Sequence, residues 1–175
     1  MGFAVELYFD PKTESTIHAL RQKLANEGIP QFLHELGDRP HVSLAVFSEV
    51  QLDTLTAVAK GFAGQMAQFE IQFGSLGAFA SPSNVLFCSP IPTNQLLEYH
   101  AKFHQILKEQ SLICSDYYLP SKWVPHCSVE MNIPNELFAE AFDVARQSFR
   151  PISGRFQEIG IVEFRPIKSL DVWDL

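Results

Sequence analysis

Two short segments combine residue types suited to acid–base chemistry at a phosphate group. His41 is followed two positions later by Ser43, His126 by Ser128, and a proline precedes each histidine. Successive side chains of a strand point to opposite faces, so each imidazole shares a face with its hydroxyl. A neutral imidazole can deprotonate a nucleophile, and an imidazolium can protonate a leaving oxygen. With an unperturbed pKa of about 6.5, histidine can take either role near neutral pH.

The two hydroxyls complete a site that needs neither a metal nor a cofactor. Ser43 and Ser128 could donate hydrogen bonds to non-bridging phosphate oxygens and hold the phosphorus between the imidazoles. His100 and His104 have the i, i+4 spacing of some zinc ligands, but no glutamate follows His100 as in the His-Glu-x-x-His motif. We therefore predict no metal and no cofactor. A metal-dependent hydrolase using His100 and His104 is the weaker alternative.

Strand-like and helix-like patterns alternate along the chain. Apolar and other residues alternate over residues 3–9, 41–47 and 126–132, which predicts strands. Apolar stripes at helical spacing predict four helices, which cover roughly residues 13–28, 52–62, 94–109 and 138–145. Because proline lacks an amide donor, each Pro-His pair should mark the beginning of a strand. Val42 and Leu44, like Cys127 and Val129, should then form buried faces opposite the histidines.

The two halves of the sequence can be aligned with each other. The two motifs lie 85 positions apart, and the same offset aligns Leu52 with Leu137 and Phe79 with Phe164. No Gly/Ser-rich linker or charge block separates the halves. The pattern predicts one domain over residues 1–175, with lobes of roughly 1–80 and 81–175 that could exchange terminal strands. If the lobes turn their polar faces toward each other, both imidazoles and both hydroxyls line one hollow.

Composition limits the possible classes of protein and of partner. The 175 residues are 46% hydrophobic and 19% charged, which is typical of a globular domain rather than a disordered chain. A net charge of −7 argues against charge-driven binding to long duplex nucleic acid. We expect no membrane span, no signal peptide and no disulfide framework from the three cysteines. These features favour a cytoplasmic location.

The paired segments RPHVSLAVF and VPHCSVEM resemble the 2H phosphoesterase superfamily, above all its bacterial branch of 2′-5′ RNA ligase-like and cyclic phosphodiesterase proteins. The resemblance extends over essentially the whole chain. It implies a bilobal, pseudo-duplicated α+β fold in which two antiparallel sheets face a central cleft and helices pack outside. It also implies that His41 and His126 are catalytic and that Ser43 and Ser128 bind the substrate phosphate. Many members of the superfamily carry threonine at these two serine positions.

Aromatic residues near the motifs are candidates for contact with a nucleobase. Single-stranded and mononucleotide ligands are often bound by stacking on aromatic rings. Tyr118 and Trp123 precede the second motif, while Tyr8 and Phe79 lie on strands expected beside the first. Packing between the lobes is the alternative role for all four.

The favoured hypothesis is a metal-independent phosphodiesterase that hydrolyses the cyclic phosphate of a 2′,3′-cyclic nucleotide or RNA terminus. One of His41 and His126 would be the base and the other the acid, an assignment that the sequence leaves open. A reversible 2′-5′ RNA ligase and a non-catalytic module that binds nucleotides or RNA ends are the alternatives. We expect the protein to be a monomer.

Overall fold

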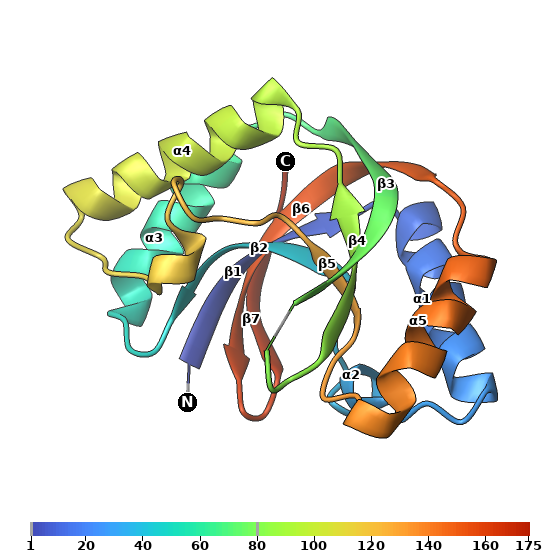
Figure 1. The fold of residues 1–175 in the computed structure, drawn as a ribbon. Helices are drawn as coiled ribbons and strands as arrows, with labels where there is room; N and C mark the ends of the chain where they lie inside the picture. The colour runs from blue at the N-terminus through green and yellow to red at the C-terminus, as the bar shows by residue number, and fades with distance from the viewer. Residues whose placement is uncertain (1, 80) are drawn as a thin grey trace.

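The computed structural model describes residues 2–79 and 81–175 and has an α+β fold, as expected (Figure 1). Seven described strands form one antiparallel sheet, ordered β2-β1-β6-β3-β4-β5, with β7 also paired to β6. The strands are β1 (Gly2–Phe9), β2 (His41–Phe47), β3 (Phe69–Phe79), β4 (Val85–Pro90), β5 (Cys127–Glu130), β6 (Ile152–Phe164) and β7 (Lys168–Asp174).

The long strand β6 joins two arms of the sheet. Strands β1, β2 and β7 form one arm, and β3, β4 and β5 form the other. Residues 152–156 of β6 pair with β3, whereas residues 156–164 pair with β1 and residues 158–163 also pair with β7. One continuous sheet therefore takes the place of the two sheets expected from the sequence. The duplication, the central cleft and the two lobes stay predictions, and the lobe boundary falls at residue 80, outside the described residues.

Two pairs of helices cover the sheet, and each pair combines one helix from each half of the sequence (Figure 1). In the pair formed by α1 and α5, helix α1 contacts β5 and β6. In the pair formed by α3 and α4, helix α3 contacts β6 and β7. The helices are α1 (Pro11–Asn26), α2 (Phe32–Glu35), α3 (Leu52–Ala63), α4 (Asn94–Glu109) and α5 (Asn135–Ser148), with a 3₁₀ turn, η1, at Asp116–Tyr118. The hydrophobic core therefore lies between the sheet and the two helix pairs that cover it.

Helix α1 begins earlier than its sequence pattern predicts. Asp10, rather than Thr13, is the N-cap, and its Oδ1 accepts a hydrogen bond from the backbone N–H of Thr13 at 3.0 Å. Pro11 fits the first turn because its missing N–H would have no partner there. Beyond the helix, Gly28 adopts a φ of +82°, which a residue with a Cβ adopts only with strain.

A β-bulge in β2 changes which of its residues point toward the core before and after the bulge. Its first part pairs His41 with Tyr8 and Ser43 with Glu6, after which the register shifts. Simple alternation would place Ala45 on the face of His41, but that expectation is wrong, because the bulge turns Ala45 to the core. The bulge thus confines the polar face of β2 to its first residues.

The buried faces of the two motif strands agree with the sequence pattern. Val42 and Leu44 of β2, like Cys127 and Val129 of β5, are fully buried. Strand β2 begins at His41, as its Pro-His pair predicts, whereas β5 begins one residue after His126. No helix among the described residues has the length and apolar character needed to cross a membrane.

Candidate active site

Strands β2 and β5 lie at opposite ends of the strand order, yet they contact each other. Buried Arg21 of α1 donates to the carbonyl oxygen of Asp38 at 2.8 Å and to that of Ser128 at 2.9 Å. The indole N–H of Trp123 donates to the carbonyl oxygen of Ser43 at 3.1 Å. The sheet is therefore curved enough to bring the two motifs together.

Further contacts occupy the outer edge of β2. Besides the indole of Trp123, the Nε2 of His104 and the backbone N–H of Ser115 donate to carbonyl oxygens of this strand. Their acceptors are Ser43, Leu44 and Val46. The segment from α4 to β5 thus covers the edge of β2 without forming a strand.

The two histidines are held in the same way. The Nδ1 of His41 lies 2.7 Å from the carbonyl oxygen of Arg39, and the Nδ1 of His126 lies 2.7 Å from that of Val124. A carbonyl oxygen can only accept, so each Nδ1 carries a proton and donates it. This arrangement fixes the ring orientation and leaves each Nε2 as the nitrogen that can exchange protons.

Two carboxylates surround the His41 ring. Glu6 Oε1 lies 3.3 Å from Nε2, and Asp38 Oδ1 lies 3.6 Å from Nδ1. Burial lowers the pKa of His41, but the negative charges of Glu6 and Asp38 outweigh burial. The pKa of His41 therefore lies above its usual range, which favours the imidazolium.

Glu6 is a site residue that the sequence reasoning missed. Its side chain is 8% exposed, and its Oε2 accepts a hydrogen bond from the hydroxyl of Tyr8 at 2.9 Å. Burial raises the pKa of Glu6, and the neighbouring His41 opposes that rise. The alternation of Glu6 and Tyr8 along β1 was the available signal, but only the register with β2 shows which residues they face.

His126 has an aromatic environment instead. The ring of Phe79 meets it edge to face at a centroid distance of 4.7 Å, and the ring of Phe87 lies at 5.4 Å. Burial lowers the pKa of His126, and the charge of His41 lowers it further, while the carbonyl oxygen of Val124 opposes both. The two histidines thus have pKa values displaced in opposite directions.

The two serines differ in their surroundings. Ser43 is 9% exposed, and its side chain interacts with the phenol of Tyr118. Burial raises the pKa of that phenol, the Glu6 charge raises it further, and the hydrogen bond with Ser43 opposes both. Ser128 is half-buried and lies opposite Phe87 in the β4–β5 pair.

The four aromatic candidates fall into two groups. Tyr8 is buried under the Arg39 guanidinium, whose Cζ lies 4.2 Å from the ring centroid, and Trp123 stacks on His100 at 3.7 Å. These rings make packing contacts within the protein. Phe79 and Tyr118 instead contact the side chains of His126 and Ser43.

The alternative metal site finds no support among residues 2–79 and 81–175. His100 and His104 are adjacent, with ring centroids 4.4 Å apart. However, the described part of the chain contains no group of three or more histidine, cysteine or acidic side chains placed to hold a metal. Glu130, on β5, accepts hydrogen bonds from the backbone N–H groups of Leu33 and Met131.

A small cavity is lined by Glu6 and Asp38, the two carboxylates that contact His41. It has a volume of about 210 Å³, and its walls include Glu6, Tyr8, Asp38 and Arg39, together with residues of the β6–β7 hairpin. Both acidic residues are buried. This cavity therefore presents carboxylates rather than free cations next to the histidine.

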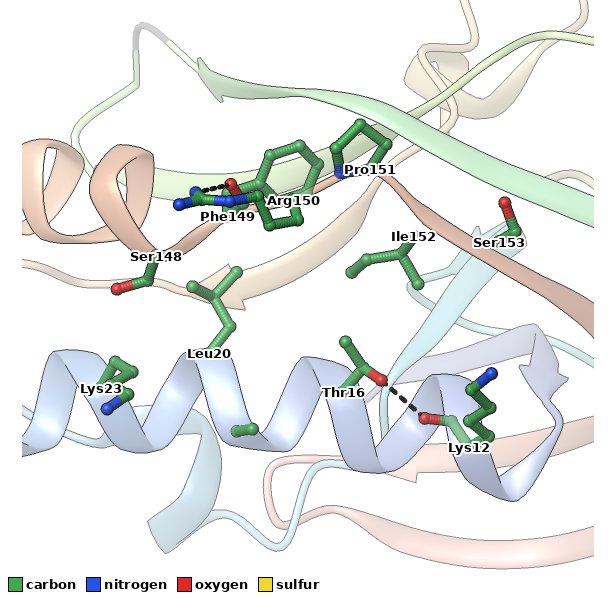
Figure 2. Close-up of a pocket in the computed structure, with 11 residues that line it drawn as sticks. Lys12, Thr16, Leu20, Lys23, Ser148, Phe149, Arg150, Pro151, Ile152 and Ser153 are labelled. Carbon is green, nitrogen blue, oxygen red and sulfur yellow. Dashed lines mark hydrogen bonds between the residues drawn. The ribbon is translucent and has the colours of Figure 1, made fainter.

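A larger pocket lies elsewhere, between α1 and the junction of α5 with β6 (Figure 2). It measures about 470 Å³, and its lining includes Lys12, Lys23 and Arg150 but none of the motif residues. The guanidinium of Arg150 is turned back onto the carbonyl oxygen of Phe149 at 2.7 Å. Nothing in this lining offers acid–base chemistry comparable to that of the two histidines.

Comparisons with solved structures show the same fold in several proteins. The structure of E. coli LigT complexed with 3′-AMP matches with a TM-score of 0.63 and 14% identity, covering 99% of this chain and 97% of that chain. TT0787 of Thermus thermophilus matches with a TM-score of 0.64 and 14% identity, covering 100% and 98%. Usb1 of Kluyveromyces marxianus with uridine monophosphate matches at 0.51 and 11%, covering 97% and 96%.

No curated protein matches the chain. A family model for the 2′-5′ RNA ligase superfamily does match, over residues 9–166, and this range contains both histidine motifs. The match covers most of the chain and agrees with the resemblance seen in the motifs and with the fold of LigT. The chain therefore belongs to the 2′-5′ RNA ligase superfamily of 2H phosphoesterases.

Proposed function

We propose that the protein is a metal-independent phosphodiesterase that opens the cyclic phosphate of a 2′,3′-cyclic nucleotide or RNA terminus. The main observation behind this proposal is that the same kind of hydrogen bond holds both histidines. Each Nδ1 donates to a carbonyl oxygen two residues earlier at 2.7 Å, so that His41 and His126 each keep Nε2 for proton transfer. A purely structural pair of histidines would not need this common tautomer.

The opposite pKa displacements of the two histidines support an assignment of the two roles. His41, beside Glu6 and Asp38, is the residue held protonated, and it is the general acid. His126, beside two phenylalanine rings, favours the neutral form and is the general base. A pair of groups with pKa values displaced in opposite directions is the usual basis of such assignments.

The reaction balances with water as the only co-reactant. Nε2 of His126 takes a proton from water as the water oxygen bonds to phosphorus. The bond from phosphorus to one ribose oxygen then breaks, and Nε2 of His41 protonates that oxygen. Ser43 and Ser128 donate hydrogen bonds to the non-bridging oxygens and orient the phosphate between the imidazoles. The product is a phosphomonoester with a free ribose hydroxyl.

The solved relatives support a nucleotide as ligand. LigT is described in complexes with 3′-AMP, NADP+, ATP and phosphate, and Usb1 with uridine monophosphate, and both share this fold. Since these ligands are all small, the comparisons favour a nucleotide or a terminal nucleotide over a long duplex. The acidic net charge of −7 favours the same choice.

Two other functions use the same residues. Attack by a ribose hydroxyl instead of water would join RNA ends in the 2′-5′ ligase direction. A module that only binds nucleotides or RNA ends would use Ser43 and Ser128 but would not need two imidazoles of opposite proton affinity. The pKa directions of His41 and His126 therefore favour an enzyme over a binding module.

The test is turnover of 2′,3′-cyclic mononucleotides and of short RNAs with cyclic phosphate ends, in the presence of EDTA. We expect hydrolysis, and we expect His41→Ala and His126→Ala each to reduce kcat by about 10² to 10⁴-fold. His34→Ala is the matched control, because this exposed histidine on α2 should leave the rate unchanged. Full activity in both motif variants would refute the mechanism, and binding without turnover across the panel would favour the module.

A further inference from the structure

Glu6 takes no part in the proposed acid–base step, yet it touches the acid. Its Oε1 lies 3.3 Å from the Nε2 of His41, the nitrogen that must face the substrate. Its Oε2 accepts the hydrogen bond of Tyr8. Among the described residues, His41 is the one ion-pair partner of Glu6, so neither arginine nor lysine neutralises this carboxylate by direct contact.

The position of Glu6 limits how far the substrate can lie from this charge. An oxygen that hydrogen-bonds to Nε2 lies about 2.8 Å from it. Because Oε1 lies 3.3 Å from the same nitrogen, that oxygen can be no more than about 6 Å from the carboxylate. This separation is shorter than the screening length of about 8 Å at physiological salt, and the carboxylate is buried.

The surrounding charges do not cancel the carboxylate. Asp38 adds a second negative charge on the other side of His41. Buried Arg21 is paired with Asp38, and the guanidinium of Arg39 is held by Glu14 and Glu158. A ligand at His41 therefore meets the imidazolium, the ion pair of Asp38 with Arg21, and the Glu6 carboxylate, whose one ion-pair partner among the described residues is His41 itself. This environment accepts one negative charge more readily than two.

Phosphate diesters and monoesters differ in the number of negative charges that they carry. A phosphodiester carries one negative charge throughout the neutral range, whereas a phosphomonoester has a second pKa of about 6 and carries close to two at pH 7.5. The substrate of the proposed reaction is a diester, and its product is a monoester. A carboxylate within 6 Å must therefore act differently on the two.

We propose that Glu6 is a selectivity residue, which admits phosphodiester monoanions to the site and disfavours phosphomonoester dianions, including the product. This inference rests on the proposed function, since it gives the substrate class and the release of product at that same site. Burial raises the pKa of Glu6, whereas the His41 imidazolium and the hydrogen bond from Tyr8 favour its charged form. Glu6 acts through that charge and by positioning His41, and it exchanges no proton with the substrate.

The test uses two inert ligands that differ by one charge. These are 2′-deoxyadenosine 3′-monophosphate and its methyl ester, and both lack the 2′-hydroxyl needed for cyclisation. We expect the wild-type protein to bind the methyl ester more tightly at pH 7.5 by calorimetry. In Glu6→Gln, the affinity for the monophosphate should rise about tenfold, and that for the ester by much less, as one partly screened charge implies.

Two further variants define the effect. Glu6→Asp keeps the charge and should keep the preference for the ester. Glu163→Gln removes a half-buried carboxylate from β6 that lies opposite Phe3 rather than Glu6 in the β1–β6 pair, and it should leave both affinities unchanged. Thermal unfolding of every variant shows whether it is folded.

A second measurement does not depend on any variant. In the wild-type protein, the ratio of the two affinities should approach one as the pH falls from 7.5 to 5, because the monophosphate becomes a monoanion. The titration of His41 and His126 in the free protein is common to both ligands and cancels in the ratio.

Several results would overturn the proposal. They are a folded Glu6→Gln variant with an unchanged preference, a wild-type ratio that does not vary with pH, or no binding of either ligand. The outcome is separate from that of the proposed function, because neither ligand is turned over. A protein that selects by charge but hydrolyses no cyclic phosphate would retain the role of Glu6 and lose the proposed activity.

Discussion

Arg21 donates a hydrogen bond to the carbonyl oxygen of Ser128, 2.9 Å away, although the two residues lie on α1 and β5. The same guanidinium forms a 2.8 Å ion pair with Asp38, three residues before His41. One buried cation is thus bonded to the chain beside both histidine motifs. The spacing of the two imidazoles therefore depends on a residue that belongs to neither motif.

Replacing Arg21 with methionine should destabilise the protein and slow the reaction. The change leaves Asp38 buried without its partner, and breaking a buried ion pair costs about 3 to 5 kcal/mol of unfolding free energy. Urea denaturation measures this loss. We expect kcat to fall more than KM rises, because the imidazoles lose their alignment and not only their affinity for substrate.

Two variants separate this role from a general loss of charge. Arg21→Lys keeps the charge but not the forked geometry, so it should recover only part of kcat. Arg146→Met breaks an exposed ion pair with Asp143 on α5 and should cost less than about 1 kcal/mol. Equal kcat values in wild type and Arg21→Met would contradict the alignment role.

The pH dependence of hydrolysis should be bell-shaped. Activity should rise as His126 loses its proton, at a pKa below the usual histidine value, and fall as His41 loses its own, at a pKa above it. The groups that face His41 are Glu6 on β1, Asp38 and Arg39 in the preceding loop, Arg21 on α1 and His126 near β5. The active range therefore lies between the two displaced pKa values.

Glu6→Gln should narrow the pH range of activity by lowering its alkaline limit. Without the negative charge at Nε2, the pKa of His41 falls, and the descending limb moves to lower pH. The pKa of His126 should change little. Where His41 becomes neutral, the pKa of His126 should rise slightly, because the positive charge of His41 lowers it. Proton NMR titration of the two imidazole Cε1–H signals follows each residue directly. An unmoved His41 titration would refute the electrostatic account.

Trp123→Phe should weaken the link between the segment before β5 and strand β2. Phenylalanine can keep the stack on His100 but cannot donate to the carbonyl oxygen of Ser43. The loss of one hydrogen bond should cost about 1 kcal/mol, which thermal unfolding can detect. Trp173→Phe on β7, away from both motifs, is the control for loss of an indole. An equal drop in kcat for both variants would argue against a specific role of Trp123.

His100 should make the protein sensitive to acid. Burial, with the nearby His104, lowers the pKa of His100 to about 3, whereas the unfolded chain takes up this proton near pH 6.5. Its contribution to stability is therefore present above pH 6.5 and is lost as the pH falls toward 3. His100→Phe should reduce the difference in urea stability between pH 7 and pH 4.5. An unchanged difference would mean that His100 does not couple folding to protons.

Local patterns predicted the parts of the structure that local geometry determines. The Pro-His pair marked the start of β2, and the aliphatic residues beside each motif formed the buried faces, because both depend on strand period alone. Apolar residues at helical spacing likewise predicted the helix over residues 94–109, and the buried residues of α4 lie at that spacing: Leu96, His100, Phe103, His104 and Leu107.

Pairing between distant segments was not predictable in the same way. The bulge in β2 turns Ala45 to the core, and no single-strand pattern shows it, because a bulge is defined by the partner strand. Glu6 was missed for the same reason, since its distance to His41 depends on the β1–β2 register. The sharing of β6 between two arms depends on three partner strands and left no local signature.

The covered edge of β2 also bears on the behaviour of the protein at high concentration. A terminal strand with unpaired carbonyl oxygens is where a foreign chain can add itself and begin aggregation. Here a tryptophan, a histidine and a backbone amide already use those acceptors. The segment that covers β2, the strand of the first histidine motif, thereby also closes this edge to intermolecular β-pairing.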